Sequence, residues 1–382
     1  MDSKQDESAH ASGRTGGQYS LVRAALGFTL LAIFVESGLA TLRVHELLSY
    51  PMLAIGLASG LSLCLAIGWQ DAKAAIGLLL VWAYMVLVHD WHCSRVDWIL
   101  IGLTGLHVCM SCCRPSPYGA LSASGRADPG GGWRASEMAI DILWLCLGLL
   151  LMALLPLHLA ILQAHGAASG VSVLLIAHGC LAAATLACVG WRREWRSTYG
   201  LCALVILVLL GLQAYGSTGG DAWRQFRGLW VLFLFLFEPH WIAPRRSQAK
   251  ELVFYDGECG LCHRAARFLL SEDVDGRAFL LAPLQGETFA AKVSAEQRAQ
   301  LPDSLIVLCD DGRLLTNSSG IVHMLLALGG LWRVLGSLLF VIPRPLRDAG
   351  YRFIASIRKR LFAAPKGLCP LLPPELGTRF LP

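Results

Sequence analysis

Long apolar runs fill most of the first 242 residues of this 382-residue chain. They occur near residues 24–42, 51–69, 74–88, 98–113, 138–161, 169–191, 199–215 and 226–242. A helix that crosses a bilayer needs about 20 predominantly apolar residues. The runs therefore predict an all-α, multi-pass membrane domain of about eight helices at residues 21–242, which contacts the lipid bilayer.

Charged residues are scarce and unevenly distributed. Asp, Glu, Lys and Arg make up 15% of the chain, whereas a soluble protein carries about a quarter. Of these 59 residues, 28 lie in residues 251–382, which indicates a more polar second domain. Residues 1–20 are polar without an apolar core, so they predict a disordered tail and not a signal peptide. Without a basic patch that contains aromatic residues, we expect no nucleic-acid partner.

The positions of Lys and Arg favour one orientation in the membrane. With eight spans, the segments on one side carry 13 of these residues and the segments on the other side carry 4. The positive-inside rule then predicts that both termini and the second domain are cytoplasmic. The longest internal loop, residues 114–136, is rich in Pro, Gly and Ser and predicts a flexible linker.

The second domain, residues 251–382, has a mixed α/β pattern. The segment ELVFY (251–255) predicts a strand, and LCHRAARFLL (261–270) predicts a helix. The segment SLIVLCDDGRLL (304–315) predicts two strands around an Asp-Asp-Gly turn, and residues 318–330 predict a helix that ends at glycine. Strand, Cys-x-x-Cys, helix, hairpin and helix is the order of a thioredoxin-like domain.

The Cys-x-x-Cys pair, Cys259 and Cys262, lies between the first strand and the first helix of this domain. Cysteines with this spacing can form a disulfide within one helical turn, and the helix dipole stabilises a thiolate at the helix start. We expect Cys259 to be the attacking thiolate, with more solvent access than Cys262, and Cys262 to be the resolving thiol.

A metal site and a purely structural pair are the alternatives for these cysteines. A structural zinc site has four ligands, commonly from two such pairs. Beyond Cys259 and Cys262 the domain offers Cys309, Cys369, His263 and His323, and it has no second Cys-x-x-Cys. The redox interpretation is favoured, and we expect neither a metal nor a cofactor.

The segment YDGECGLC (255–262) resembles the signature of the DCC family of thiol-disulfide oxidoreductases, which is named for its Asp-Cys-Cys motif. Asp256, Cys259 and Cys262 match that motif. The resemblance continues through FLLAPLQG (279–286), residues 302–330 and 342–362, and Cys369, so it covers essentially all of residues 251–382. One departure is ASIRKRLF (355–362), where the family has Asn before the residue that is Arg358 here. The resemblance implies a thioredoxin-like fold and protein-disulfide reductase activity.

Two further residues are candidates for a supporting role. Asp256 is suited to capping the helix, to accepting a proton during exchange, or to forming an ordinary turn. Pro302 precedes the hairpin, where thioredoxin-like proteins often have a cis-proline. Because Asp303 and Ser304 separate it from the strand, an ordinary loop proline is favoured.

The membrane part contains two weaker candidates. Cys109 and Cys112 form a second Cys-x-x-Cys, which is suited to exchanging electrons with Cys259 and Cys262, although small residues that fill a helix interface are the favoured interpretation. Glu36 has apolar residues on both sides, and ionisable groups at membrane depth are functional candidates. This part resembles DoxX-like and vitamin K-dependent carboxylase-like modules only weakly.

These observations favour a membrane-anchored enzyme that exchanges thiols and disulfides with a protein or a small thiol. Because the cytoplasm keeps thiols reduced, we expect the reaction to reduce a substrate disulfide. The alternative is a membrane carrier or quinone-linked electron conduit, with the dithiol domain as its regulator or electron donor. A non-catalytic scaffold is the third interpretation.

Overall fold

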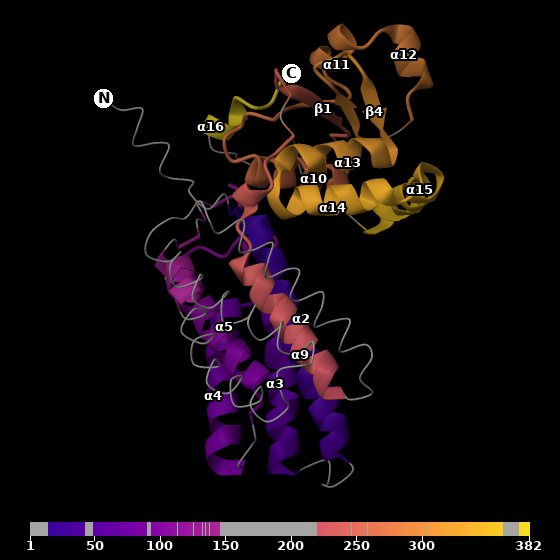
Figure 1. Ribbon diagram of the computed structural model, residues 1–382. Helices are drawn as coiled ribbons and strands as arrows, with labels where there is room; N and C mark the ends of the chain where they lie inside the picture. The colour runs from indigo at the N-terminus through magenta and orange to yellow at the C-terminus, as the bar shows by residue number, and fades with distance from the viewer. Residues whose placement is uncertain are drawn as a thin grey trace, which may run out of the picture. The chain divides into compact units, whose positions relative to one another are not determined.

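The computed structural model describes residues 14–145, 220–361 and 374–382, apart from short gaps at residues 43–48, 90–92, 113, 125, 132, 134, 137, 246, 258 and 303 (Figure 1). The chain divides into two compact units. The first, here called the dithiol unit, comprises the described residues within Met1–Ser20, Pro115–Arg134 and Pro239–Pro382. The second, the helical unit, comprises those within Leu21–Arg114 and Ala135–Glu238.

The helical unit is built from apolar helices. The named helices are α2 (Gly16–Thr41), which begins in the dithiol unit, α3 (Tyr50–Ile67), α4 (Asp71–His89), α5 (Arg95–Ser111) and α9 (Gly220–Leu236). In the described part of the chain, α2, α3 and α4 are long and apolar enough to cross a membrane, which supports a membrane protein. Helix α3 packs on α4, α4 on α5, and α5 on α9. Residues 138–145 are helical, and the predicted spans at 169–191 and 199–215 lie outside the described residues.

Helix α9 begins six residues before the apolar run predicted at 226–242, and it ends earlier. Its first turns contain Arg224 and Arg227, two of the four basic residues that were counted on the less basic side of the membrane. Arg224 forms an ion pair of 2.8 Å with Asp97, and Arg227 donates two hydrogen bonds of 2.9 and 2.7 Å to Glu36. These acidic partners allow charged residues within an apolar helix. The chain then enters a 3-10 turn, η4 (Pro239–Trp241).

Helix α2 begins at Gly16, inside the segment 1–20 that was predicted to be disordered. The amide of Gly17 donates a hydrogen bond of 2.9 Å to Glu272, and the Thr15 hydroxyl and the Trp332 indole also donate to this carboxylate. Burial raises the pKa of Glu272, and these donors act in the opposite direction. The buried carboxylate therefore fixes residues 15–17 within the dithiol unit.

The loop at 114–136, which was predicted to be a flexible linker, also makes defined contacts in the dithiol unit. It contains a short 3-10 turn, η2 (Leu121–Ala123). The Tyr118 hydroxyl donates a hydrogen bond of 3.3 Å to the carbonyl of Arg264, and the Trp133 ring stacks on Tyr19 at 5.0 Å between centroids. Aromatic side chains, which the Pro, Gly and Ser content obscured, order this loop.

The core of the dithiol unit is a four-stranded mixed sheet. Its strands are β1 (Glu251–Tyr255), β2 (Phe279–Pro283), β3 (Ile306–Leu308) and β4 (Leu314–Thr316). They lie in the order β2-β1-β3-β4, with β1 parallel to β2 and with β3 antiparallel to both β1 and β4. The first strand and the hairpin around the Asp-Asp-Gly turn confirm the predictions for 251–255 and 304–315.

Helices cover both faces of this sheet. Successive side chains of a strand point to opposite faces, so Val253 and Tyr255 pack with α10 (Gly260–Glu272) and α13 (Asn317–Leu328). Phe254 faces the other side and packs on Phe289 of α11 (Glu287–Lys292), with ring centroids 4.8 Å apart. The predicted helices at 261–270 and 318–330 therefore form one covering layer of the sheet.

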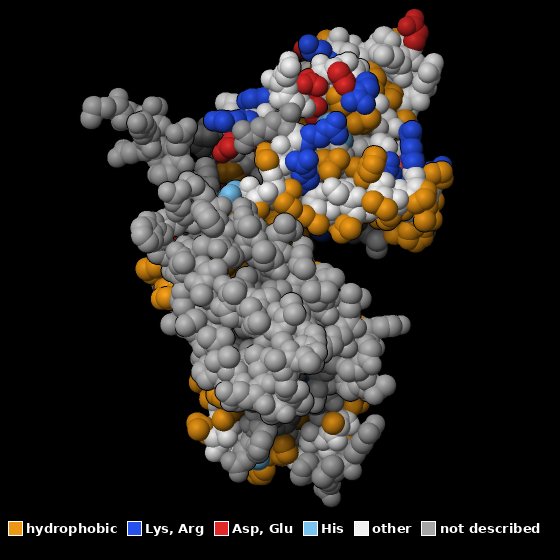
Figure 2. Space-filling model, viewed as in Figure 1, with side chains coloured by type: hydrophobic (Ala, Val, Ile, Leu, Met, Phe, Trp, Pro, Cys, Tyr) orange, Lys and Arg blue, Asp and Glu red, His pale blue; other side chains and the backbone are white. Residues whose placement is uncertain are grey.

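The remaining helices of this unit are α12 (Ala295–Gln300), α14 (Gly330–Val341), α15 (Arg344–Leu361) and α16 (Pro374–Gly377). Figure 2 shows hydrophobic side chains gathered over α14 and α15, and the exposed ones include Leu338, Phe340 and Phe353. After α16, Phe380 bridges to Leu281 of β2. This attachment places the C-terminal residues beside the sheet.

Candidate functional site

Cys259 and Cys262 lie in the first turn of α10, immediately after the loop that follows β1. Cys259 is the N-cap residue, and Cys262 is the third residue of the helix. The amide groups of a first helical turn lack intrahelical acceptors and favour negative charge nearby. The position predicted from the sequence is therefore the observed one.

Both cysteines are buried, and the predicted difference in solvent access is wrong. Cys259 is 3% exposed and Cys262 is 6% exposed. Both belong to the core cluster on the α10 and α13 face of the sheet, together with Tyr255 and Met324. The N-cap position brings Cys259 under this apolar layer, because α10 packs against the sheet from its first turn. A macromolecule can therefore reach either sulfur only after local opening at this position.

The loop that carries Cys259 is held from both sides. His263 Nε2 lies 3.1 Å from the carbonyl oxygen of Gly257, and its ring contacts that of Tyr255 at 5.9 Å between centroids. Gln285 follows β2, and its side chain accepts a bond of 3.4 Å from the Gly257 amide and donates one of 3.4 Å to Asp256. In the sequence, His263 is a candidate metal ligand only, and Gln285 has no predicted role. The position of His263 directly after Cys262 was the available signal.

The other predicted candidates lie elsewhere. Pro302 is exposed in the loop between α12 and β3, and the described part of the chain contains no cis peptide bond. Cys109 and Cys112 lie at the end of α5 in the helical unit. Glu36 of α2 belongs to the same unit and pairs with Arg227.

Comparison with known proteins places the dithiol unit in a family. Residues 253–364 match the model of the DCC1-like thiol-disulfide oxidoreductases. A segment of 135 residues is 34% identical to the uncharacterized protein YuxK of Bacillus subtilis (strain 168), and it covers 34% of this chain and 93% of that protein. No solved structure matches the chain significantly. The C-terminal third of the chain belongs to the DCC1-like thiol-disulfide oxidoreductase family.

The DCC1-like match runs from β1 into α15 and therefore includes Cys259, Cys262 and His263. It also includes a third buried cysteine, Cys309, which directly follows β3. The family thus supports thiol-disulfide chemistry, with thiols or disulfides as the substrates of this unit.

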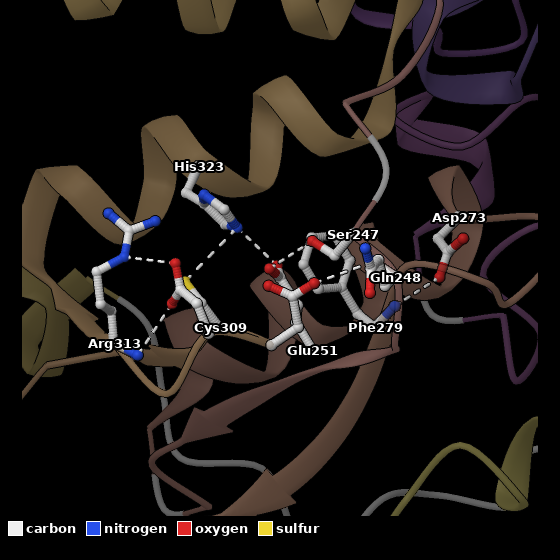
Figure 3. Close-up of polar contacts among 10 residues, drawn as sticks. Ser247, Gln248, Glu251, Asp273, Phe279, Cys309, Arg313 and His323 are labelled. Atoms are coloured by element: carbon white, nitrogen blue, oxygen red, sulfur yellow. Dashed lines mark hydrogen bonds and ion pairs between the residues drawn. The ribbon is translucent and has the colours of Figure 1, made fainter.

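Glu251, Cys309 and His323 converge at the other end of β1 (Figure 3). His323 Nε2, on α13, lies 2.6 Å from Glu251 Oε2 and 3.8 Å from Cys309 Sγ. Ser247 donates a hydrogen bond of 2.6 Å to the second oxygen of Glu251. The sequence predicts no metal site here, because Glu251 and His323 are 72 positions apart and no local motif joins them.

The surroundings of this cluster shift the pKa values of Glu251 and Cys309. Burial raises the pKa of Glu251, but hydrogen bonds from His323 and Ser247 outweigh it, and the net pKa lies below the usual value. Burial, followed by the charges of Glu251 and Asp311, raises the pKa of Cys309 to about 11. Because the thiolate is the nucleophilic form, Cys309 is unsuited to attack a disulfide at neutral pH.

The helical unit contains a buried ionisable cluster that the sequence does not predict. Arg23 of α2, Asp71 of α4 and His107 of α5 are each less than 5% exposed. Asp71 lies 4.0 Å from Arg23 and 3.6 Å from His107. The Arg23 guanidinium also donates a hydrogen bond of 2.7 Å to the carbonyl of Leu65. The cluster links four helices. Arg23 and Asp71 lie just outside the predicted apolar runs and His107 lies inside one, so no local pattern signals it.

Proposed function

We propose that the protein is a membrane-anchored thiol-disulfide oxidoreductase that uses Cys259 and Cys262 as a redox-active dithiol. The observation that carries this proposal is the position of both sulfurs in the first turn of α10, within the region matched by the family. Thiol-disulfide enzymes use this spacing because the first turn stabilises a thiolate and the second sulfur lies within reach of the first.

In the first step of the proposed reaction, the Cys259 thiolate attacks one sulfur of a substrate disulfide. A Cys259–substrate disulfide forms, the substrate S–S bond breaks, and the second substrate sulfur leaves as a thiolate that takes up a proton. The N-cap position favours Cys259 for this role, because the unpaired amides of the first turn lie beside it.

In the second step, the Cys262 thiolate attacks the Cys259 sulfur of the mixed disulfide. A Cys259–Cys262 disulfide forms and the remaining substrate thiol is released, so two electrons and two protons have passed to the substrate. A dithiol reductant of the same compartment then restores both cysteines. A protein disulfide or a small-molecule disulfide satisfies this scheme equally well, and no cofactor takes part.

The proposed fold of residues 251–382 is thioredoxin-like. Two parallel strands joined through α10, followed by an antiparallel hairpin and a helix, support it. We assign the membrane part to residues 21–242, with Tyr118 and Trp133 of its loop at 114–136 packed in the dithiol unit. Exposed leucines on the candidate spans, such as Leu57 and Leu80, suit contact with lipid.

The test compares Cys262→Ser with Cys259→Ser in the full-length protein. Cys262→Ser should accumulate a mixed disulfide with substrate, since the resolving thiol is absent, and Cys259→Ser should abolish turnover and trapping. Cys64→Ser on α3 is the control, because it removes a cysteine of the helical unit and should leave exchange unchanged. Trapping by Cys259→Ser alone would reverse the two roles, and full turnover in both variants would exclude the dithiol as the redox centre.

The buried cluster of Arg23, Asp71 and His107 favours a second candidate, an electron or proton conduit that the dithiol regulates or supplies. Ionisable groups inside a membrane domain often mark such pathways, and Cys109 and Cys112 lie in the same unit. The exchange assay separates the candidates. If the protein is a dithiol enzyme, Asp71→Asn and the double variant Cys109→Ser/Cys112→Ser retain activity on a soluble disulfide. If it is a conduit, these variants lose the turnover that depends on the membrane.

A further inference from the structure

The cluster of Glu251, Cys309 and His323 (Figure 3) lies at the opposite end of β1 from Cys259 and Cys262. Glu251 is the first residue of β1, and Cys259 lies beyond its last residue, Tyr255. Five residues of strand span about 13 Å at about 3.3 Å per step. The cluster and the cysteine pair are therefore two separate sites at opposite ends of β1.

Strand pairing brings the first two members together. Leu252 of β1 pairs with Leu308 of β3, so Glu251 and Cys309 are the next opposite pair. Residues directly opposite on antiparallel strands project to the same face of a sheet. Helix α13 covers that face and supplies His323. The three side chains thus converge because of the sheet register and helix packing, and not because of proximity in the sequence.

The distances suit a common metal ion. All three ligand atoms lie within 4.8 Å of one another. Zinc bonds of about 2.0–2.3 Å at tetrahedral angles place neighbouring ligand atoms about 3.3–3.6 Å apart. The distance between Cys309 Sγ and His323 Nε2, 3.8 Å, is already close to this range. The distance between His323 Nε2 and Glu251 Oε2, 2.6 Å, needs to lengthen by less than about 1 Å.

The geometry is a poor fit for a nucleophilic Cys–His–Glu triad. In such a triad the base uses one ring nitrogen for the nucleophile and the other for the carboxylate. Here the same atom, His323 Nε2, faces both Cys309 and Glu251. A single N–H cannot serve both groups, whereas a single cation can bind all three atoms.

We propose that Glu251, Cys309 and His323 bind a zinc ion through three protein ligands. Thiolate, imidazole and carboxylate are all zinc ligands, and a thiolate disfavours magnesium and calcium. The two negative ligands balance the charge of the ion. Ser247 orients Glu251 through the hydrogen bond to its other oxygen. Water, or a small thiol, completes the tetrahedron on the side where the His323 side chain is 17% exposed.

This site joins the start of the sheet to the segment that leads into it. Ser247 contacts Glu251, and the Gln248 amide donates a hydrogen bond of 2.9 Å to Asp310, the residue after Cys309. A bound ion therefore fixes residues 247–251 to the β3–β4 turn and to α13, and its role is to stabilise the entry to the redox domain.

The experiment uses full-length protein in which Cys259→Ser and Cys262→Ser remove the dithiol, because two thiolates can bind zinc on their own. After equilibration with zinc and removal of the excess, this protein should retain one equivalent of zinc. Adding Cys309→Ser or His323→Ala should lower affinity by more than about 100-fold, because loss of an outer-shell partner alone costs about 10- to 100-fold. Ser247→Ala should fall within that smaller range.

Cobalt provides a readout that does not depend on activity. Cobalt bound to this protein should show a thiolate-to-metal charge-transfer band, which Cys309→Ser should abolish and Ser247→Ala should retain. Glu251→Gln keeps the shape of the side chain and tests the carboxylate without a large change in packing. Circular dichroism checks the fold of each variant. The proposal would be overturned if the protein that lacks the dithiol bound no zinc, or if Cys309→Ser and Glu251→Gln left zinc binding unchanged. The hydrogen bond between His323 and Glu251 would then only connect α13 to β1.

Discussion

His263 Nε2 lies 3.1 Å from the carbonyl oxygen of Gly257, two residues before Cys259. A carbonyl oxygen only accepts, so Nε2 carries the proton and donates it. The side chain of the residue after Cys262 thereby fixes the backbone before Cys259. We infer that His263 is a positioning residue, which sets the geometry of the dithiol loop without contacting the substrate.

Two variants separate the hydrogen bond of His263 from its packing. His263→Phe keeps a ring against Tyr255 and removes the donor, whereas His263→Gln keeps a donor and removes the ring. Loss of one hydrogen bond costs about 1 kcal/mol, so His263→Phe should slow disulfide exchange by about fivefold, and His263→Gln should restore much of the rate.

The pH dependence of Cys259 alkylation shows whether His263 acts through the loop. Displacement of the loop changes the exposure of Cys259 to the first-turn amides, so His263→Phe should shift the alkylation profile, while the free energy of unfolding falls by only the ~1 kcal/mol of the lost hydrogen bond. Equal exchange rates and equal profiles in His263→Phe and the unaltered protein would remove the positioning role.

The buried ion pair of Asp273 and Arg379 predicts a stability effect. The Asp273 carboxylate accepts from the amides of Ala278 and Phe279 and lies 2.6 Å from the Arg379 guanidinium, with both side chains less than 10% exposed. Removing one partner leaves an unpaired buried charge, which costs about 3–5 kcal/mol. Arg379→Met should therefore increase proteolysis of the dithiol unit by at least about 100-fold, since each 1.4 kcal/mol corresponds to about tenfold.

The pair of Asp311 and Arg313 is the matched control for this effect. Its nitrogen and oxygen also lie 2.6 Å apart, but both side chains are largely exposed. Exposed ion pairs contribute little to stability, so Arg313→Met should leave the proteolysis rate unchanged. Comparable proteolysis rates for Arg379→Met and Arg313→Met would show that burial does not determine how much these ion pairs stabilise the unit.

The sequence was sufficient where local pattern determines structure. The strand at 251–255, the start of α10 at the dithiol and the glycine end of α13 follow from strand periodicity, helix signals and Gly329, whose φ is +78°. Apolar content likewise located α3 and α4 within a few residues.

Long-range pairs account for what the sequence did not reveal. Helix α9 extends through Arg224 and Arg227 because Asp97 and Glu36 lie opposite them. The burial of Cys259 depends on how α10 and α13 pack on the sheet, and the convergence of Glu251 with His323 depends on strand register. None of these relationships has a local periodicity, so a single sequence cannot supply them.

The distribution of Lys and Arg predicts that the dithiol unit is cytoplasmic. Some of the counted residues lie within helices of the structure, so the count on each side of the membrane changes. Five of the counted residues lie within helices: Arg23 in α2, Lys73 in α4, Arg95 in α5, and Arg224 and Arg227 in α9. Leaving them out gives 11 basic residues against 1, which preserves the bias. The bias therefore does not depend on these helical residues.

Impermeant maleimide labelling of intact cells tests this orientation. Cys259 is a poor reporter because it is 3% exposed, whereas Glu296 on α12 is exposed and suits a Glu296→Cys reporter. Leu42 is 41% exposed at the end of α2, and a helix of 26 residues spans about 39 Å, so Leu42→Cys reports the opposite side from Gly16. Relative to the parent chain, Leu42→Cys should label in intact cells, and Glu296→Cys only after permeabilisation. The reverse pattern would place the dithiol in an oxidising compartment, where disulfide formation, and not reduction, is the expected direction.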